Sequence, residues 1–132
     1  MDRRKLFKRL TLLILLIFIA NLFANTFYLY SSIWYFDIIM HFSGGFFLGL
    51  LALYLFKLEI INSRVILKVL LFVLLIGLIW EIYEVVVDAF FSKNAFDLFD
   101  SSSDVFFDLL GGASAIFYFT KRIMLAGENK VK

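Results

Sequence analysis

The chain has 132 residues, of which 63% are hydrophobic and 20% are aromatic, and its mean hydropathy is +0.94. Soluble domains are about 45–50% apolar, so this composition excludes a protein whose surface is mostly covered by water. The chain contains no cysteine, which excludes disulfides and thiolate metal sites. Its length allows one domain, and its net charge of +2 gives no reason to expect a nucleic-acid partner.

Four apolar segments follow one another, at residues 10–30, 33–56, 65–87 and 105–120. Each is close to the ~20 residues that a helix needs to cross a bilayer, although the fourth is short. The segments are continuous rather than alternating, which favours helices over the strands of a barrel. The sequence therefore predicts an all-α integral membrane bundle of four transmembrane helices, in a single membrane domain over residues 1–132.

The basic residues predict the orientation of these helices. Twelve of the thirteen lie at 3–9, 57–68 and 121–132, and only Lys93 falls on the opposite side. By the positive-inside rule, both termini lie in the cytoplasm of a multi-pass protein of the cell (inner, cytoplasmic) membrane. A basic start before an apolar run is also the pattern of a cleaved signal peptide. The length of the run and the lack of a clear A-x-A site favour a retained helix.

The acidic residues gather in the opposite, outer half of the predicted bundle. Eight of the eleven lie there: Asp37, Glu81, Glu84, Asp88, Asp97, Asp100, Asp104 and Asp108. Acidic residues contribute little to membrane orientation. Their bias therefore needs a separate cause.

Three segments carry polar and small residues on one helix face. The series are Asp37, His41, Gly45 and Gly49; Gly77, Glu81, Glu84 and Asp88; and Asp100, Asp104, Asp108 and Gly112. Residues three or four apart share a helix face, and small residues allow close helix packing in membranes. The sequence predicts three helices in tight contact at the glycines, opening outward around a polar pocket. His41, Glu81 and Asp108 lie at similar depth and are expected to meet there.

The pocket residues suggest a cation site. Clustered carboxylates repel one another unless they bind protons or a cation, and oxygen ligands with one imidazole suit several divalent ions. The sequence predicts a divalent cation (Mg²⁺, Mn²⁺, Zn²⁺ or Ca²⁺), and the expected ligands are Glu81, Glu84, Asp100, Asp104 and Asp108. His41, oriented by Asp37 one turn away, is the expected nucleophile or general acid–base, so the catalytic set is His41, Asp37, Glu81 and Asp108.

Simpler structural roles are open for most of these residues. His41 alone has the pattern of a hydrogen-bonded packing histidine. The acids have the pattern of helix caps, loop residues or interface anchors; this applies to Glu84, Asp88, Asp97, Asp100 and Asp104. His41, Glu81 and Asp108 remain the strongest candidates because they lie deepest.

Three motifs carry a resemblance to known families. They are "DIIMHFSGG" from Asp37, "WEIYE" from Trp80, and "DLFDSSSD" from Asp97, which leads to Gly112 and Ala113. The chain resembles the YjdF-like and VanZ-like small polytopic membrane proteins across residues 34–113. It departs from the VanZ-like pattern at Glu84 and Asp108 and lacks the VanZ-like arginine, so it is closer to the YjdF-like side.

The resemblance implies a cell-envelope protein, and VanZ-like proteins have been grouped with lipid head-group enzymes. It would place His41, Glu81, Asp104 and Asp108 in an active site. The favoured function is hydrolysis or exchange of a phospholipid or polyprenyl-phosphate head group. The alternatives are a non-enzymatic ion-, proton- or lipid-binding protein and a structural or partner-binding protein. The expected partner is a membrane lipid or lipid-linked phosphate, with a second copy of the chain as a further candidate.

Overall fold

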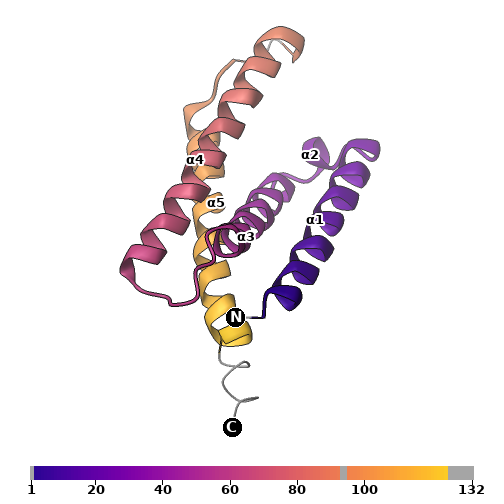
Figure 1. Cartoon of the computed structure of the whole chain (residues 1–132). Coiled ribbons are helices and arrows are strands. Elements are labelled where there is room, and N and C mark those ends of the chain that lie inside the picture. The colour runs from indigo at the N-terminus through magenta and orange to yellow at the C-terminus, as the bar shows by residue number, and fades with distance from the viewer. Residues whose placement is uncertain (1, 93–94, 125–132) are drawn as a thin grey trace.

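The computed structural model describes residues 2–92 and 95–124, and all its regular elements are helices. Helices make up 87% of that part of the chain, which contains no strand. The elements are α1 (Arg3–Thr26), α2 (Leu29–Ser32), α3 (Phe36–Leu55), α4 (Ser63–Val87), the π-helical turn η1 (Asp88–Ser92), α5 (Leu98–Phe119) and the π-helical turn η2 (Thr120–Met124) (Figure 1). The all-α prediction is confirmed.

The first predicted segment, 10–30, is divided between two helices. α1 begins at Arg3 because the basic residues continue the helix and the Asp2 side chain accepts a hydrogen bond from the Lys5 amide at 3.1 Å. A side-chain oxygen in this position satisfies an amide that has no partner inside the helix. The helix ends at Thr26, where Tyr28 takes a left-handed backbone conformation with φ of 56°.

α5 begins at Leu98, well before the predicted start at 105. Its N-cap is Asp97, whose carboxylate accepts hydrogen bonds from the amides of Phe99 at 2.9 Å and Asp100 at 3.3 Å. The cap role considered for Asp97 is therefore confirmed, and the cap role considered for Asp104 is wrong. The apolar pattern missed the first turns because Asp100 and the three serines at 101–103 lower their hydropathy.

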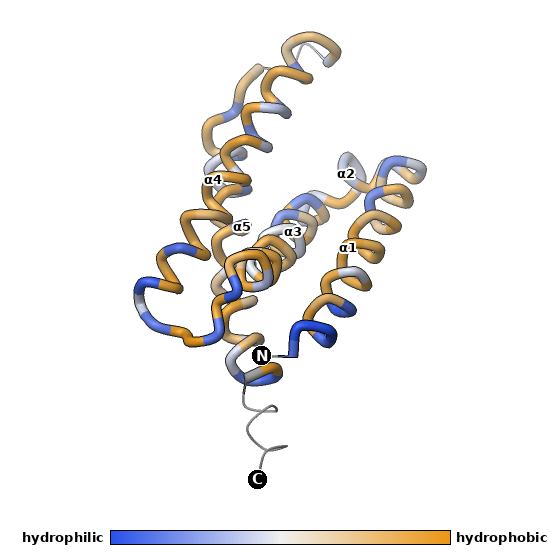
Figure 2. The backbone as a smooth tube through the Cα atoms, in the orientation of Figure 1, coloured by the Kyte–Doolittle hydropathy of each residue, from blue (hydrophilic) through white to orange (hydrophobic). Residues whose placement is uncertain are grey.

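Three helices are long and apolar enough to cross a bilayer: Arg3–Thr26, Phe36–Leu55 and Ser63–Ser92. Most residues along the helices are hydrophobic (Figure 2), and large side chains such as Leu15, Phe18 and Leu71 are more than half exposed. Water would penalise so much exposed apolar area, whereas lipid would not. The chain is thus a multi-pass membrane protein. Of the four predicted spans, the fourth does not meet the same test, because its helix carries several aspartates.

An apolar core joins the four long helices at one end of the bundle. Its large, fully buried side chains come from every long helix: Leu6, Leu50, Leu53, Val69 and Phe119. Leu50 and Leu53 lie near the end of α3, and Phe119 is the last residue of α5. This core lies at one end of the bundle, so the residues that fill the other end need not be apolar.

α3 and α5 form the closest helix pair, and α3 lies between α5 and α1 (Figure 1). Two glycines make the approach possible. A Cβ atom at Gly45 would overlap with the backbone carbonyl of Asp108, and a Cβ atom at Gly111 would overlap with the carbonyl of Phe42. The predicted tight contact through small residues is present between these two helices.

We expect Gly45→Ala to destabilise the bundle by roughly 1–3 kcal/mol, the usual cost of overpacking a close contact. The new methyl group meets backbone atoms of α5, which cannot move aside without separating the helices. The measurement is unfolding of the purified protein in detergent, followed by circular dichroism.

Gly44→Ala is the matched control, because a Cβ atom at Gly44 meets nothing within 4 Å. Alanine is the better helix former by about 1 kcal/mol, so this variant should be as stable as the parent or slightly more. Equal stability of the two variants would refute the close contact between α3 and α5.

Candidate functional site

Four buried polar side chains, which together form the polar cluster, converge next to the contact that Gly45 and Gly111 make between α3 and α5. His41 comes from α3, Glu81 from α4, and Asp104 and Asp108 from α5. Their exposed fractions are 7%, 7%, 4% and 5% respectively. Ionisable groups at membrane depth normally face the bundle interior and one another. The helices thus bring His41, Glu81 and Asp108 together, as the sequence predicted.

His41 is held by a carboxylate from the neighbouring helix. Its Nδ1 lies 3.2 Å from Asp108 Oδ1, within hydrogen-bond distance. Its Nε2 lies 3.7 Å from both Asp37 Oδ1 and Asp104 Oδ2. We expected Asp37 to orient the ring, but the carboxylate that accepts a hydrogen bond from the ring is that of Asp108. When Nδ1 carries the proton, it donates a hydrogen bond to Asp108, and Nε2 faces the other carboxylates as an acceptor.

Two groups of side chains could each hold a metal ion. The inner group combines His41, Glu81, Glu84 and Asp104, whose ligand atoms all lie within 4.8 Å of one another. The outer group combines Asp37, Asp100 and Asp104 and is more exposed. Asp104 belongs to both. The expected ligands Glu81, Glu84 and Asp104 are thus brought together, and Asp100 lies in the outer group.

Asp108 belongs to neither group, although we expected it to be a ligand. Its Oδ1 is engaged with His41, and its Oδ2 points toward α4, 2.7 Å from the position that a Cβ atom of Gly77 would occupy. Gly77 thus provides the space for the Asp108 carboxylate. Asp108 is placed to orient the histidine ring rather than to contact an ion in the inner group.

Glu81 has an unsatisfied oxygen. Its Oε1 is buried and has no hydrogen-bond partner in the described part of the chain. A buried carboxylate oxygen without a partner is costly and calls for a ligand, an ion or water. Within residues 2–92 and 95–124, no lysine or arginine pairs with the clustered acids, whose ion pairs are all with His41. The cluster is therefore rich in negative charge and short of positive charge.

Tyr30 in α2 lies close enough to feel the charge of this cluster, although the sequence did not single it out. Burial raises the pKa of the Tyr30 phenol, and the nearby negative charges of Asp37 and Glu84 raise it further. The phenol is therefore protonated at neutral pH, and its hydroxyl donates to Asn21 Oδ1 at 2.8 Å. This contact joins α2 to α1 beside the polar cluster.

We expect His41→Ala and Asp108→Ala to be coupled in a double-mutant cycle. Interhelical hydrogen bonds in membrane proteins contribute about 0.6 kcal/mol on average and up to ~2 kcal/mol. The coupling energy should lie in this range, because each single variant leaves the other buried group without its partner. Unfolding of the four proteins in mixed detergent micelles measures it.

The same cycle between His41→Ala and Asp97→Ala serves as the control. Asp97 caps its own helix and is exposed, so its loss should add to the loss of His41 without coupling. Equal coupling in the two cycles would contradict the specific pairing of His41 with Asp108.

Comparison with known proteins gives a family but no relative of known activity. No curated protein and no solved structure matches the chain. The YjdF-like and VanZ-like names are therefore not supported by these comparisons and stay a resemblance of motifs. A family model described as "Predicted membrane protein (DUF2238)" matches residues 1–124. The match includes all the helices and every residue of the polar cluster, and the chain belongs to the DUF2238 family of membrane proteins.

Proposed function

We propose that this protein uses a divalent cation to hydrolyse or exchange the phosphate head group of a membrane lipid. The observation that carries the proposal is the inner group, in which His41, Glu81, Glu84 and Asp104 place four ligand atoms within 4.8 Å of one another. These residues come from three helices that are far apart in the sequence. The motifs that resemble YjdF-like and VanZ-like proteins include the same residues.

The ligand set favours Mn²⁺ or Zn²⁺, because it combines three carboxylates with one imidazole. Mg²⁺ and Ca²⁺ would rely on the carboxylates alone. A bound cation also removes the repulsion between acids that have no basic partner in the described residues. The hydrogen bond from His41 Nδ1 to Asp108 is the usual arrangement for a metal-binding histidine, whose second nitrogen donates to a carboxylate.

The proposed reaction is attack of a water oxygen on the lipid phosphorus. The bond from phosphorus to the head-group oxygen breaks, and the proton of the water passes to the departing alcohol. A divalent cation held by His41, Glu81, Glu84 and Asp104 would offset the charge that builds up on the phosphate oxygens. If His41 is a ligand, an acid of the outer group such as Asp37 takes the proton from water. If carboxylates alone hold the ion, His41 Nε2 takes that proton.

A non-enzymatic ion- or proton-binding role is the second candidate. No lysine or arginine among the described residues pairs with the acids, and this favours the non-enzymatic role. Sites that bind phosphate usually include a lysine or arginine that donates hydrogen bonds to it. A purely structural role predicts instead that the glycines between α3 and α5 matter more than any acid.

We infer that α5 is a fourth spanning helix. We also infer that the protein lies in the inner membrane, with both termini in the cytoplasm. The buried acids of α5 support the fourth span, because Asp104 and Asp108 face the bundle rather than lipid. The distribution of basic residues supports the orientation.

Cysteine labelling tests this arrangement, since the natural chain contains no cysteine. With four crossings, an impermeant maleimide should label Asp97→Cys in intact cells and label Glu59→Cys and Lys132→Cys only after permeabilisation. Labelling of Lys132→Cys in intact cells would mean three crossings and would refute the fourth span.

Metal binding and lipid turnover test the function directly. We expect purified protein to bind Mn²⁺, measured by electron paramagnetic resonance, and to release head group from radiolabelled phospholipid. Glu81→Gln should abolish both. Asp108→Asn should weaken Mn²⁺ binding by about 10–100-fold, the usual effect of removing the hydrogen-bond partner of a ligand.

His41→Ala separates the two roles of the histidine. It should weaken Mn²⁺ binding if the ring is a ligand, and abolish turnover with binding intact if the ring accepts the proton. Asp97→Asn is the matched control and should change neither measurement. Mn²⁺ binding without any lipid product would favour the non-enzymatic role, and the absence of both would refute the proposal.

A further inference from the structure

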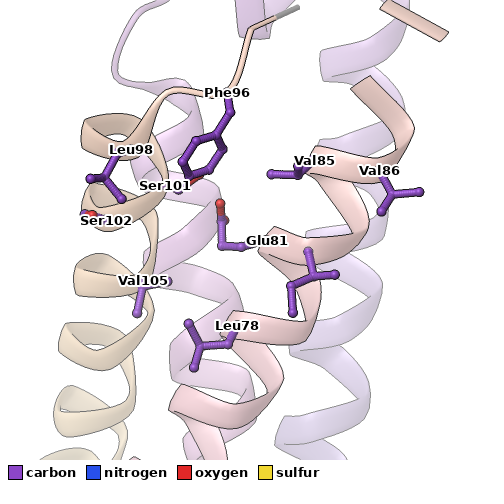
Figure 3. Close-up of a pocket in the computed structure, with 10 residues that line it drawn as sticks. Leu78, Glu81, Val85, Val86, Phe96, Leu98, Ser101, Ser102 and Val105 are labelled. Carbon is purple, nitrogen blue, oxygen red and sulfur yellow. The ribbon is translucent and has the colours of Figure 1, made fainter. Parts of the chain in front are cut away.

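A groove lies between α4 and α5, beside the polar cluster. Its volume is about 560 Å³, which falls within the range of about 300–1,000 Å³ that is typical of ligand pockets. Its lining residues are Leu78, Glu81, Ile82, Val85, Val86, Phe96, Leu98, Ser101, Ser102 and Val105. Figure 3 shows the two helices as its walls, with Phe96 across one end. Sequence reasoning missed this groove, because no single segment reveals it.

The groove is apolar along most of its length and opens at the outer surface of the bundle. Several of its side chains are strongly exposed, among them Ile82, Val86 and Leu98. They lie on or beside α4, one of the helices able to cross a bilayer. An open apolar groove on such a surface does not hold water well, and the hydrocarbon of the surrounding lipid is the material available to fill it.

One ionisable group interrupts this apolar lining. Glu81 is 7% exposed, its Oε1 has no hydrogen-bond partner in the described part of the chain, and its carboxyl group points into the space between the helices (Figure 3). The hydroxyl groups of Ser101 and Ser102 also line the groove. The groove thus combines an apolar surface with one carboxylate oxygen, Glu81 Oε1, that still lacks a hydrogen-bond partner in the described part of the chain.

Glu81 also belongs to the inner metal-binding group with His41, Glu84 and Asp104. Glu81 therefore belongs both to the lining of the groove and to the polar cluster, and it connects the two. A molecule lying in the groove with a polar group at Glu81 would present that group to the cluster. No other described residue is shared between the groove lining and the inner group.

We propose that the α4–α5 groove binds one acyl chain of a two-chain phospholipid and thereby places the phosphate of that lipid beside Glu81. This inference rests on the proposed function for the role of the phosphate, but the acyl-chain site stands on the groove itself. The lipid enters sideways from the bilayer, between α4 and α5. A two-chain lipid fits best, because the open side of the groove allows the second chain to stay among the bulk lipids.

Photocrosslinking tests the acyl-chain site. The probe is phosphatidylglycerol with a diazirine in one acyl chain, added at a low fraction to phosphatidylethanolamine–phosphatidylglycerol vesicles that contain the full chain. Peptide mass mapping should find several-fold more label on Leu78, Ile82 and Val105 than on Leu12 or Leu75, and excess unlabelled phosphatidylglycerol should remove that difference. Uniform labelling of all lipid-facing positions would overturn the proposal.

Leu78→Trp and Leu75→Trp form a matched pair on α4. Both replace an exposed leucine, but only Leu78 lines the groove. Leu78→Trp should reduce labelling of Ile82 and Val105 several-fold, and Leu75→Trp should leave it unchanged. Val105→Phe narrows the groove from α5 and provides a second test should Leu78→Trp fail to fold. Unchanged labelling in a folded Leu78→Trp or Val105→Phe variant would refute the site.

Combining the labelling with the Mn²⁺-binding and head-group-release measurements separates this inference from the proposed function. Groove labelling that persists while Mn²⁺ binding and head-group release are absent supports the acyl-chain site and refutes the proposed function. Turnover with uniform labelling refutes the acyl-chain site alone. Competition by a polyprenyl phosphate, with none by phosphatidylglycerol, would overturn the choice of a two-chain lipid.

Discussion

The close contact between α3 and α5 is the constraint on which the other features depend. Gly45 lies against the backbone carbonyl of Asp108, and Gly111 lies against that of Phe42. This approach fixes the rotation and register of one helix against the other, so that Asp108 reaches the ring of His41 one turn from Gly45. Without it, a histidine and two aspartates would face lipid or an enlarged void, at a cost of several kcal/mol each.

The bundle therefore has two interiors of opposite character. At one end, leucine, valine and phenylalanine side chains fill the space between all four long helices. At the other, the side chains are ionisable and short of positive partners. Apolar packing within a membrane gains little from excluding water, since lipid is equally apolar, and depends on shape. The glycine contact lies between the two interiors and holds the polar end together.

Helical spacing was enough to predict much of the polar cluster. Steps of four residues identified the faces that carry His41, Asp104 and Asp108, and the mirror order in the third segment identified Glu81. The hydrogen-bond partner of His41 could not be predicted, because it depends on how α3 and α5 are rotated against each other. Asp37 was the partner expected from spacing alone, yet it lies 3.7 Å from Nε2. The start of α5 was missed because a hydropathy pattern detects only apolar residues, and the first turns contain Asp100 and three serines.

The length of α4 together with η1 has a mechanical consequence. The 30 residues from Ser63 to Ser92 form a rod of about 45 Å, against a hydrocarbon layer of about 30 Å. Tilting, or projection of the helix ends into the head-group region, must absorb the excess. Because this helix is also one wall of the groove and carries Glu81, a tilt of α4 relative to α5 would change the width of the groove and the depth of Glu81. The thickness of the host membrane, through that tilt, would then act on the polar cluster without contacting any of its residues.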